Sequence, residues 1–234
     1  MTVENNDDTW VVTGSNRGIG LAVAEAHLAR EGHVLAGFRG APCDALLDLR
    51  DRFGDRLTHV PLDLRAPPDP DLIRQVVSRP IDVIFHNAGI FGPRAPGFRD
   101  LDHAAVLEAF DVNVLGMIRV TEAFLPYMEG APRPRIVAVS SLMGTIAKAA
   151  PDSFAYRTSK AAMNMALHLM AAELTSSGIA LACLRPGHVR TDMGGPHGSL
   201  SPAESAAAML PIVDRLQPAD RPPFLDIDGQ ALPW

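Results

Sequence analysis

The chain has few cysteines, and it has no long apolar run. Its 234 residues include only Cys43 and Cys183, which lie far apart and outside the spacings typical of metal sites. We therefore expect reduced thiols, no bound metal and a cytoplasmic location. No segment approaches the ~20 apolar residues of a membrane span. The acidic, polar stretch MTVENNDDTW at residues 1–10 is unlike a signal peptide.

A strong excess of charge is also absent. The 21 basic and 27 acidic side chains give a formal net charge of −6, so composition gives no reason to expect nucleic acid or a membrane surface as a partner. Hydrophobic residues make up 47% of the chain and charged residues 21%, an ordinary globular balance. Lysine is scarce: of the 21 basic residues, only Lys148 and Lys160 are lysines. Each lysine is therefore a candidate for a role that arginine cannot fill.

Apolar segments alternate between the spacing of strands and that of helices. The expected strands are 10–13, 33–38, 57–62, 81–85, 136–140, 179–184 and 224–227. The expected helices are 19–31 (closed by Gly32), 41–53, 71–78, a long helix from a cap at Asp100 or Asp102 to near Met128, 154–176 and 203–216. Strands separated by helices form a parallel sheet that is covered on both faces. We predict one α/β domain over 1–234, a doubly wound, Rossmann-type sheet of about seven strands with its site at the strands' carboxyl ends.

A glycine-rich turn follows the first expected strand. It reads Thr13-Gly14-Ser15-Asn16-Arg17-Gly18-Ile19-Gly20. Glycines let the backbone approach a diphosphate closely, and the amino end of the next helix offers free N–H groups. A glycine pattern alone is a weak signal, but its place between a strand and a helix predicts a dinucleotide site.

The residues after the second strand bear on the choice of cofactor. A site for NAD usually has a carboxylate there, which binds the ribose 2′-hydroxyl. Here the strand ends at Arg39, and no acid occurs before Asp44. The guanidinium groups of Arg17 and Arg39 suit a 2′-phosphate, which favours NADP(H) over NAD(H). Arg39 alone could equally be a solvated loop residue.

Two further strand ends offer cofactor contacts. Asp63 and Leu64 follow the third strand, where a carboxylate could accept a hydrogen bond from the adenine amino group. The small residues of Asn87-Ala88-Gly89 follow the fourth strand and would let a nucleotide lie against its end. His86, just before them, is expected to be a packed imidazole rather than a catalyst.

Tyr156 and Lys160 share one face of the longest expected helix. A nearby cation lowers the pKa of a phenol from its usual ~10, which allows the phenol to exchange a proton with a carbonyl oxygen. Ser140 and Ser141 end a strand, where a hydroxyl could donate to the same oxygen. Taken singly, a Tyr–Lys pair is usually a surface pair, and an asparagine such as Asn113 more often satisfies backbone groups.

As a set, these residues resemble the short-chain dehydrogenase/reductase family. The match runs over about residues 9–191, in the family's order: the glycine turn, Asn87-Ala88-Gly89, Asn113, Ser141, Tyr156 with Lys160, Pro186-Gly187 and Thr191. The segments AYRTSKAAMNM, TDMGGPHGSLSPAES and FLDIDGQALPW look like the branch that contains C-factor and Sniffer-like carbonyl reductases. The resemblance implies an oxidoreductase with a nicotinamide cofactor.

The resemblance also implies a role for each matching residue. Tyr156 would be the acid/base, Lys160 its tuner and a ribose ligand, and Ser141 the donor to the substrate oxygen. Asn113 would hold a water of a proton relay, and Thr191 would contact the nicotinamide carboxamide. Further implied cofactor contacts are Pro186, Gly187 and Val189.

The chain departs from the family pattern at two places. His86 replaces the first asparagine of the usual N-N-A-G, which should alter packing more than catalysis. Ser141 lies two positions further from Tyr156 than is common in the family, and the common spacing would select Met143, which cannot do this chemistry. An insertion within 142–155 repairs the alignment, and Ser140 remains a rival.

The expected activity is reversible, NADPH-dependent reduction of an aldehyde or ketone. The alternatives are a signalling or sensor protein of the C-factor type that binds NADP without turnover, and an NAD-dependent alcohol dehydrogenase. Segments 142–155 and 188–200 should line the substrate pocket. The expected apolar lining residues are Leu142, Met143, Ile146, Met193 and Leu200.

Two surfaces carry further expectations. Helical regions 101–128 and 154–176 have apolar residues on more than one face, which predicts a homodimer or homotetramer. The residues concerned are Leu115, Met117, Ile118, Met165, Leu169 and Met170. The glycine-rich segment 188–201 lacks a regular period, so we expect no stiff resting structure and a lid over the site. The alternative is an ordinary surface loop.

Overall fold

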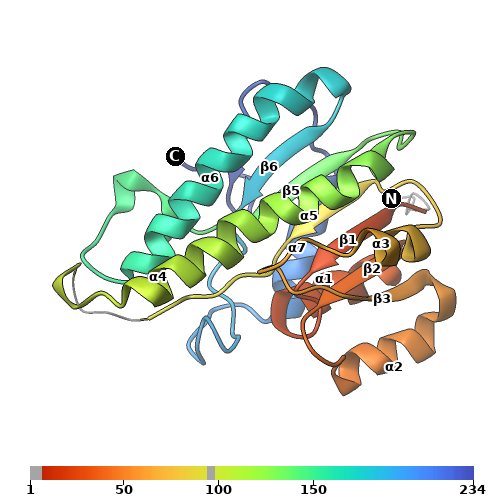
Figure 1. Cartoon of the computed structure of the whole chain (residues 1–234), viewed down its shortest axis with the longest axis horizontal. Helices are drawn as coiled ribbons and strands as arrows, with labels where there is room; N and C mark the ends of the chain where they lie inside the picture. Colours follow the sequence, from red (N-terminus) through yellow and green to blue (C-terminus); the bar gives the residue numbers. More distant parts are fainter. Residues whose placement is uncertain (1–6, 94–97) are drawn as a thin grey trace.

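The computed structural model describes residues 7–93 and 98–234 and contains a seven-stranded sheet with helices on both faces (Figure 1). Residues 1–6, on which the comparison with a signal peptide partly rests, lie outside this description. All paired strands are parallel, in the order β3-β2-β1-β4-β5-β6-β7. The strands are β1 (Thr9–Thr13), β2 (His33–Phe38), β3 (Leu57–Pro61), β4 (Val83–His86), β5 (Arg135–Val139), β6 (Ala180–Leu184) and β7 (Phe224–Leu225). The predicted doubly wound α/β architecture is confirmed.

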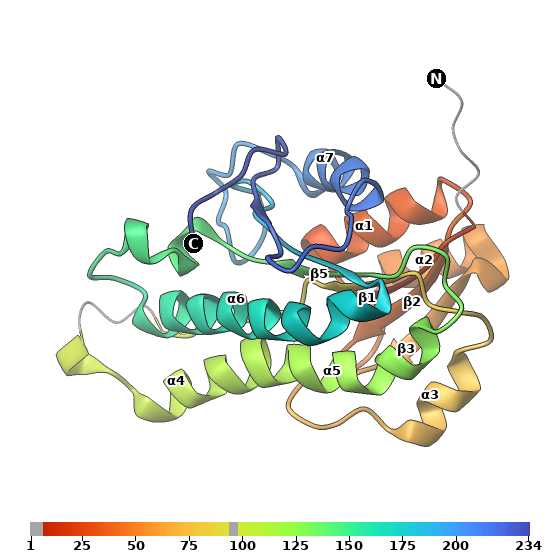
Figure 2. The same ribbon diagram turned by 90° about the horizontal axis from the view of Figure 1, so that it is seen from above.

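The helices form one layer on each face of the sheet (Figure 2). Helices α1 (Gly18–Leu28), α2 (Asp44–Phe53) and α7 (Pro202–Asp214) cover one face, and α3 (Pro70–Val76), α4 (His103–Phe110), α5 (Gly116–Phe124) and α6 (Phe154–Leu174) lie on the other. Successive residues of a strand point to opposite faces, so Val12 belongs to the first hydrophobic cluster and Val11 to the second. Burial on both faces explains why these strands are almost wholly apolar.

The first helix ends earlier than expected. The sequence predicts a helix over 19–31 closed by Gly32, but α1 ends at Leu28, and Glu31 takes the left-handed conformation with φ 68°. The reason for the glycine is steric: a Cβ at Gly32 would lie 2.1 Å from Nε2 of His27. Gly32 thus makes room for a buried imidazole, and its N–H also closes the helix by donating to the main-chain oxygen of His27 at 3.2 Å.

The long helix expected before Met128 is interrupted. Asp102 caps α4 by accepting hydrogen bonds from the N–H groups of Ala104 and Ala105. A π-helical turn (Asp111–Leu115) then separates α4 from α5, and the last turn before Met128 is 3₁₀. A π turn inserts a residue into the helical repeat and is common near functional sites. The π turn that contains Asn113 changes the directions of the side chains of α5 relative to those of α4.

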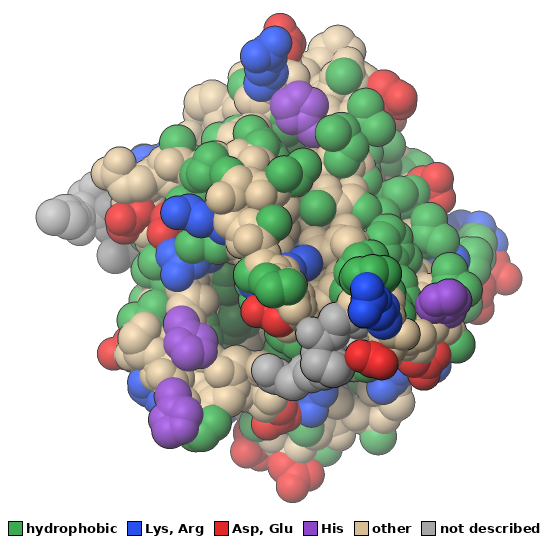
Figure 3. Space-filling view, turned by 90° about the vertical axis from the view of Figure 1, so that its left-hand side faces the viewer, with side chains coloured by type: hydrophobic (Ala, Val, Ile, Leu, Met, Phe, Trp, Pro, Cys, Tyr) green, Lys and Arg blue, Asp and Glu red, His purple; other side chains and the backbone are tan. Residues whose placement is uncertain are grey.

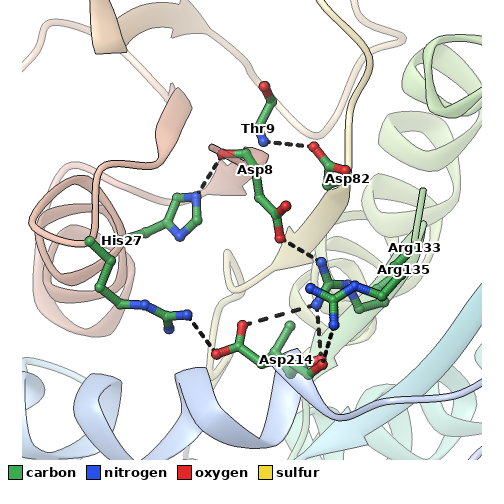
Figure 4. A network of polar contacts seen from close by, with 9 residues as sticks. Asp8, Thr9, His27, Asp82, Arg133, Arg135 and Asp214 are labelled. Atoms are coloured by element: carbon green, nitrogen blue, oxygen red, sulfur yellow. Dashed lines mark hydrogen bonds and ion pairs between the residues drawn. The ribbon is translucent and has the colours of Figure 1, made fainter. Parts of the chain in front are cut away.

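A network of polar side chains joins the layers at the amino ends of the strands (Figure 4). Arg135 on β5 is fully buried, and its Nη2 donates to Oδ2 of Asp8 at 2.7 Å. Its Nη1 forms an ion pair with Oδ1 of Asp214 on α7 at 4.0 Å, and the other carboxylate oxygen, Oδ2, accepts from Arg30 at 2.6 Å. Nε2 of His27 lies 2.9 Å from the main-chain oxygen of Asp8. The network thereby connects β1 and β5 to α1 and α7.

Among the described residues, no helix is long and apolar enough to cross a bilayer.

Candidate active site

The predicted site residues gather at the carboxyl ends of the strands, the face that Figure 3 shows. Two adjacent cavities open there. The glycine-turn cavity has a volume of about 700 Å³, and it is lined by the glycine turn, Arg39, Asp63, Leu64, residues 87–90 and residues 190–193 among others. The Tyr156 cavity has a volume of about 590 Å³, and its lining includes Phe91, Ser140, Ser141, Met143, Asp152, Tyr156, Arg185, residues 186–189 and Met193. Met193 lines both.

The glycine turn has the shape of a cradle for a diphosphate. Gly14 and Gly18 adopt left-handed conformations, with φ 70° and 56°, which glycine adopts without strain. A Cβ at Gly20 would lie 2.3 Å from the main-chain oxygen of Gly14. No side chain caps the amino end of α1, so its N–H groups can bind an anion. Asn87 supports the turn by donating to the main-chain oxygen of Thr13 at 3.0 Å.

Two polar side chains of the turn serve its own structure. The Ser15 hydroxyl is buried and donates to the main-chain oxygen of Val12 at 2.7 Å. Asn16 donates to the oxygen of Ala41 at 2.9 Å and accepts from the N–H of Cys43 at 2.6 Å. Ser15 thus ties the turn to the end of β1, and Asn16 ties it to the start of α2. Contacts from Ser15 and Asn16 to a cofactor would therefore come from the backbone.

The charged residues around the glycine-turn cavity differ in their partners. Arg39 is exposed and has no ion pair among the described residues. Nη1 of Arg17 donates to Oδ2 of Asp192 at 2.7 Å, with both side chains largely exposed. Arg65 binds the Asp63 carboxylate at 2.6 Å and lowers the pKa of that carboxyl to about 2. Asp192 is a partner that the sequence did not reveal, since an ion pair between distant segments leaves no local pattern. Arg65, by contrast, lies only two positions after Asp63.

Ser141, Tyr156 and Lys160 come together beside the second cavity. Tyr156 and Lys160 lie in the first turns of α6, and both are buried. Nζ of Lys160 lies 5.8 Å from the centre of the Tyr156 ring and donates to the oxygen of Val139 at 2.8 Å. The hydroxyls of Ser141 and Tyr156 are hydrogen bonded. A phenol and a hydroxyl therefore line one cavity wall, and an ammonium is buried beside the phenol.

Burial is the main influence on the two ionisable groups of this constellation. It raises the pKa of Tyr156, and the hydrogen bond with Ser141 acts in the opposite direction. Burial also lowers the pKa of Lys160 to about 8. The ammonium of Lys160 is turned to the main-chain oxygen of Val139, so its expected influence on the pKa of Tyr156 stays a prediction.

The structure separates the two candidate serines. Ser140 is buried, and its Oγ donates to Oδ1 of Asn164 at 2.5 Å. Ser141 begins the next 3₁₀ turn, and its Oγ accepts from the N–H of Met143 at 3.1 Å while it also contacts Tyr156. The arrangement supports Ser141 as the donor to a substrate. Asn164, which occupies Ser140, was missed by sequence reasoning.

The Asn113 side chain links two segments through hydrogen bonds. Its Nδ2 donates to the oxygen of Ile90 and to Oγ of Ser159, both at 2.9 Å, and its Oδ1 accepts from the N–H of Ile90 at 2.8 Å. The amide has two N–H donors, and both are in use. Its side chain therefore has no donor left for a relay water, contrary to the simplest form of the expected role. It ties the segment after β4 to α6.

His86 is a packed imidazole, as expected. It is buried, and its Nε2 lies 2.9 Å from Oγ1 of Thr121. Burial lowers the pKa of His86 to about 3. Because the ring is buried at the end of β4 and lines neither cavity, it is not placed to exchange a proton with a substrate.

The lining of the Tyr156 cavity differs from the expected one. Met143 and Met193 line it, but Leu142, Ile146 and Leu200 do not. Ile146, in the 3₁₀ turn Ile146–Lys148, is 81% exposed. Leu200 instead packs beside Gly187.

Phe91 and Arg185 line the same cavity and were missed by sequence reasoning. The Phe91 ring stacks on Tyr156 with 4.5 Å between ring centres. Their only sequence signal was position: Phe91 shortly follows Asn87-Ala88-Gly89, and Arg185 directly precedes Pro186-Gly187.

The segment 188–201 has a defined resting structure, contrary to expectation. The N–H of Arg190 donates to the oxygen of Leu200, and its Nη1 donates to the oxygen of Gly198, both at 2.8 Å. Oγ1 of Thr191 accepts from the N–H of Gly194 at 3.0 Å. Gly194 leaves no room for a side chain, because a Cβ would lie 2.1 Å from the oxygen of Val189. The glycines here permit close packing rather than disorder.

The apolar helix faces expected at a subunit contact are exposed only in part. Leu115, Met165 and Leu169 are 46%, 60% and 62% exposed. Met117 is buried in this chain's own core, and Ile118 and Met170 pack partly against it. Leu107 on α4 is 70% exposed and extends the surface.

Comparison with known proteins gives a consistent picture. Residues 8–199 match the short chain dehydrogenase family. The C-signal protein of Myxococcus xanthus is 39% identical over 160 residues, which cover 68% of this chain and 96% of that protein. The carbonyl reductase Sniffer of D. melanogaster superposes with a TM-score of 0.86 at 27% identity, covering 97% of this chain and 99% of that one. A carbonyl reductase from Pseudomonas aeruginosa in complex with NADP gives 0.81 at 31% identity, with coverage of 97% and 99%.

Proposed function

This chain belongs to the short-chain dehydrogenase family, and from that premise we propose that it reduces an aldehyde or ketone reversibly with NADPH, acting as one domain. The observation that carries the proposal is the meeting of Ser141 and Tyr156 at one cavity wall, with Lys160 buried beside the Tyr156 ring, next to a cavity built on a glycine turn. A protein that only senses a nucleotide has no need of a phenol and a hydroxyl aimed at a second cavity.

The cofactor would lie in the glycine-turn cavity. Gly14, Gly18 and Gly20 would hold the diphosphate, because side chains there would fill the cradle. Arg39, exposed at the end of β2, would bind the 2′-phosphate of NADP. Support for NADP also comes from the P. aeruginosa carbonyl reductase, whose structure contains it. When bound, the nicotinamide supplies the hydride.

The protein's own groups would manage the proton. Ser141 would donate a hydrogen bond to the substrate oxygen, which stabilises the negative charge that develops there. Tyr156 would give that oxygen its proton, and Lys160 would bind the ribose and favour the phenolate that remains. Burial of Tyr156 and its stacking on Phe91 hold the ring in position at the cavity wall.

Steady-state consumption of NADPH with a panel of aldehydes and ketones tests the proposed function. Turnover of at least one carbonyl compound, with NADPH preferred to NADH, is expected. Tight binding of NADP without turnover of any compound would favour the sensor alternative. A preference for NADH would favour the NAD-dependent alternative.

Self-association stays a prediction, and we propose that Leu107, Leu115, Met165 and Leu169 form its contact. Their exposed apolar side chains lie on one helical layer of the sheet, and burying them between two copies would remove them from water. Light scattering should give a dimer or tetramer at micromolar concentration, and Leu169→Glu should shift it toward the monomer. A monomeric wild type would contradict the prediction.

A further inference from the structure

The Tyr156 cavity contains an arginine that the mechanism above does not use. Arg185 lies between the end of β6 and Pro186, and it lines the cavity together with Tyr156 and Ser141. Its N–H donates to the oxygen of Leu225 at 2.8 Å, which fixes its position at the border of β6 and β7. Among the described residues that line this cavity, it is the only lysine or arginine.

The Arg185 side chain is held from one side. Its Nη1 donates to Oδ2 of Asp226 at 2.6 Å, and 28% of the side chain is exposed. Asp226 is itself fixed, because its Oδ1 accepts from the N–H of Ile227 at 2.8 Å. A guanidinium has five N–H donors, and the hydrogen bond described for Arg185 uses one of them. Asp226 does not line the cavity, so the carboxylate anchors the arginine without covering the cavity wall.

The other charges of the cavity do not compete for an anion. Asp152 lines the mouth, but Nε of Arg157 donates to its Oδ1 at 2.9 Å and offsets its charge. His188 also lines the cavity, and its Nε2 lies 3.0 Å from the main-chain oxygen of Gly194. Among the described residues that line this cavity, Arg185 therefore supplies the cationic side chain.

We propose that Arg185 binds a carboxylate of the substrate, so that this enzyme prefers aldehydes or ketones that carry a carboxylate. The inference rests on the proposed reductase function and names its substrate class. The planar fork of a guanidinium matches the two oxygens of a carboxylate. Phe91, Met143 and Met193 offer apolar contact to the carbon skeleton between the carboxylate and the carbonyl group.

The test compares each of two acids with its uncharged methyl ester. The pairs are 4-carboxybenzaldehyde with methyl 4-formylbenzoate, and phenylglyoxylate with methyl phenylglyoxylate, which place the carboxylate far from and next to the carbonyl group. The quantity measured is the ratio of kcat/KM for acid to ester, in which a general loss of activity cancels. For at least one pair, the wild type should favour the acid, and Arg185→Gln should lower the ratio tenfold or more, since hydrogen bonds to charged groups are strong.

Two further variants sharpen the test. Asp226→Asn removes the opposing charge and should leave the ratio unchanged or raise it. Arg133→Gln removes an exposed arginine at the opposite end of the sheet and should leave the ratio unchanged. If the ion pair only supports the fold, Arg185→Gln and Asp226→Asn will each lower kcat/KM for the acid and for the ester by the same factor, and the inference is overturned.

Inhibition of the wild type tests the role of Arg185 without requiring that any variant folds. 4-Methylbenzoate should inhibit reduction of the ester competitively, and at least ten times better than 4-methylbenzamide does. Equal inhibition by the two, or a wild type that favours the esters in both pairs, contradicts the role of Arg185 while the reductase function stands. If neither acid nor ester is reduced, and the wider carbonyl panel also fails, the proposed function itself fails.

Discussion

The two ends of the sheet bury charge in different ways. At the amino end, Arg135 is fully buried but lies between the carboxylates of Asp8 and Asp214 (Figure 4). At the carboxyl end, the ammonium of Lys160 is equally buried, yet it donates to a main-chain oxygen, and its pKa falls to about 8. A charge flanked by opposite charges supports the fold, whereas a charge with a poor partner is poised to meet a ligand.

The comparison has consequences for each end. Variants at the amino end should change stability and leave the chemistry of the folded protein intact. Variants at the carboxyl end should change chemistry or cofactor affinity with little effect on stability. The predictions below test this division, beginning with the largest effect.

Tyr156→Phe should lose almost all turnover while binding NADPH nearly normally. The ring that stacks on Phe91 remains, but the transferable proton is gone, and general acid catalysis contributes about 10²–10⁴-fold. Steady-state kinetics and NADPH titration check this, with thermal unfolding as a control for the fold. A variant that keeps a tenth of the wild-type kcat would remove Tyr156 from the mechanism.

Arg135→Met should lower the free energy of unfolding by about 3–5 kcal/mol, since it leaves the carboxylates of Asp8 and Asp214 without their buried cation. Urea unfolding at pH 7 measures the change. Arg133→Met is the matched control, because Arg133 is exposed and only its 3.4 Å hydrogen bond to the oxygen of Asp214 is lost. The control should change stability by less than about 1 kcal/mol. Similar losses in both variants would mean that the network is not what stabilises this end.

His27 should make the fold sensitive to acid. Burial lowers its pKa from 6.5 to about 4, so the unfolded chain binds a proton that the folded chain excludes. The contribution of neutral His27 to the free energy of unfolding is fully present above pH 6.5. It should fall by about 3 kcal/mol as the pH drops to 4.

His27→Phe isolates this contribution, because it keeps a ring stacked on Trp10 and removes the titration. Urea unfolding between pH 6.5 and 4 should show a shallower fall in the free energy of unfolding for the variant than for the wild type. Equal slopes would show that His27 is not the group responsible.

Arg39→Asp should weaken NADPH binding about 10- to 150-fold, the loss of a hydrogen bond worth about 1.5–3 kcal/mol. NADH use should fall far less, or rise. Because Arg39 is exposed, the free energy of unfolding should hardly change. Fluorescence titration with each nucleotide measures both affinities, and a wild type that prefers NADH would refute the argument.

Contacts between residues far apart in the chain could not be predicted from the sequence. The local sequence does not distinguish Ser140 from Ser141. Only the position of Asn164 on α6 shows that the Ser140 hydroxyl is already hydrogen bonded. Asn113 was identified as important, but its partners Ile90 and Ser159 come from other segments. The same limit hid Arg185, whose place in the cavity depends on how β6, β7 and the turn at Asp226 pack.

The sequence by itself determined the architecture and the order of the motifs. Apolar runs with strand or helix spacing, separated by turns, specify a parallel sheet with two helical layers, and the residues that follow each strand meet at one edge. Tertiary structure decided which side chains there are free to act. That choice depends on hydrogen bonds, burial and charge pairing between distant segments, such as Arg17 with Asp192 and Arg185 with Asp226, and no local pattern encodes them.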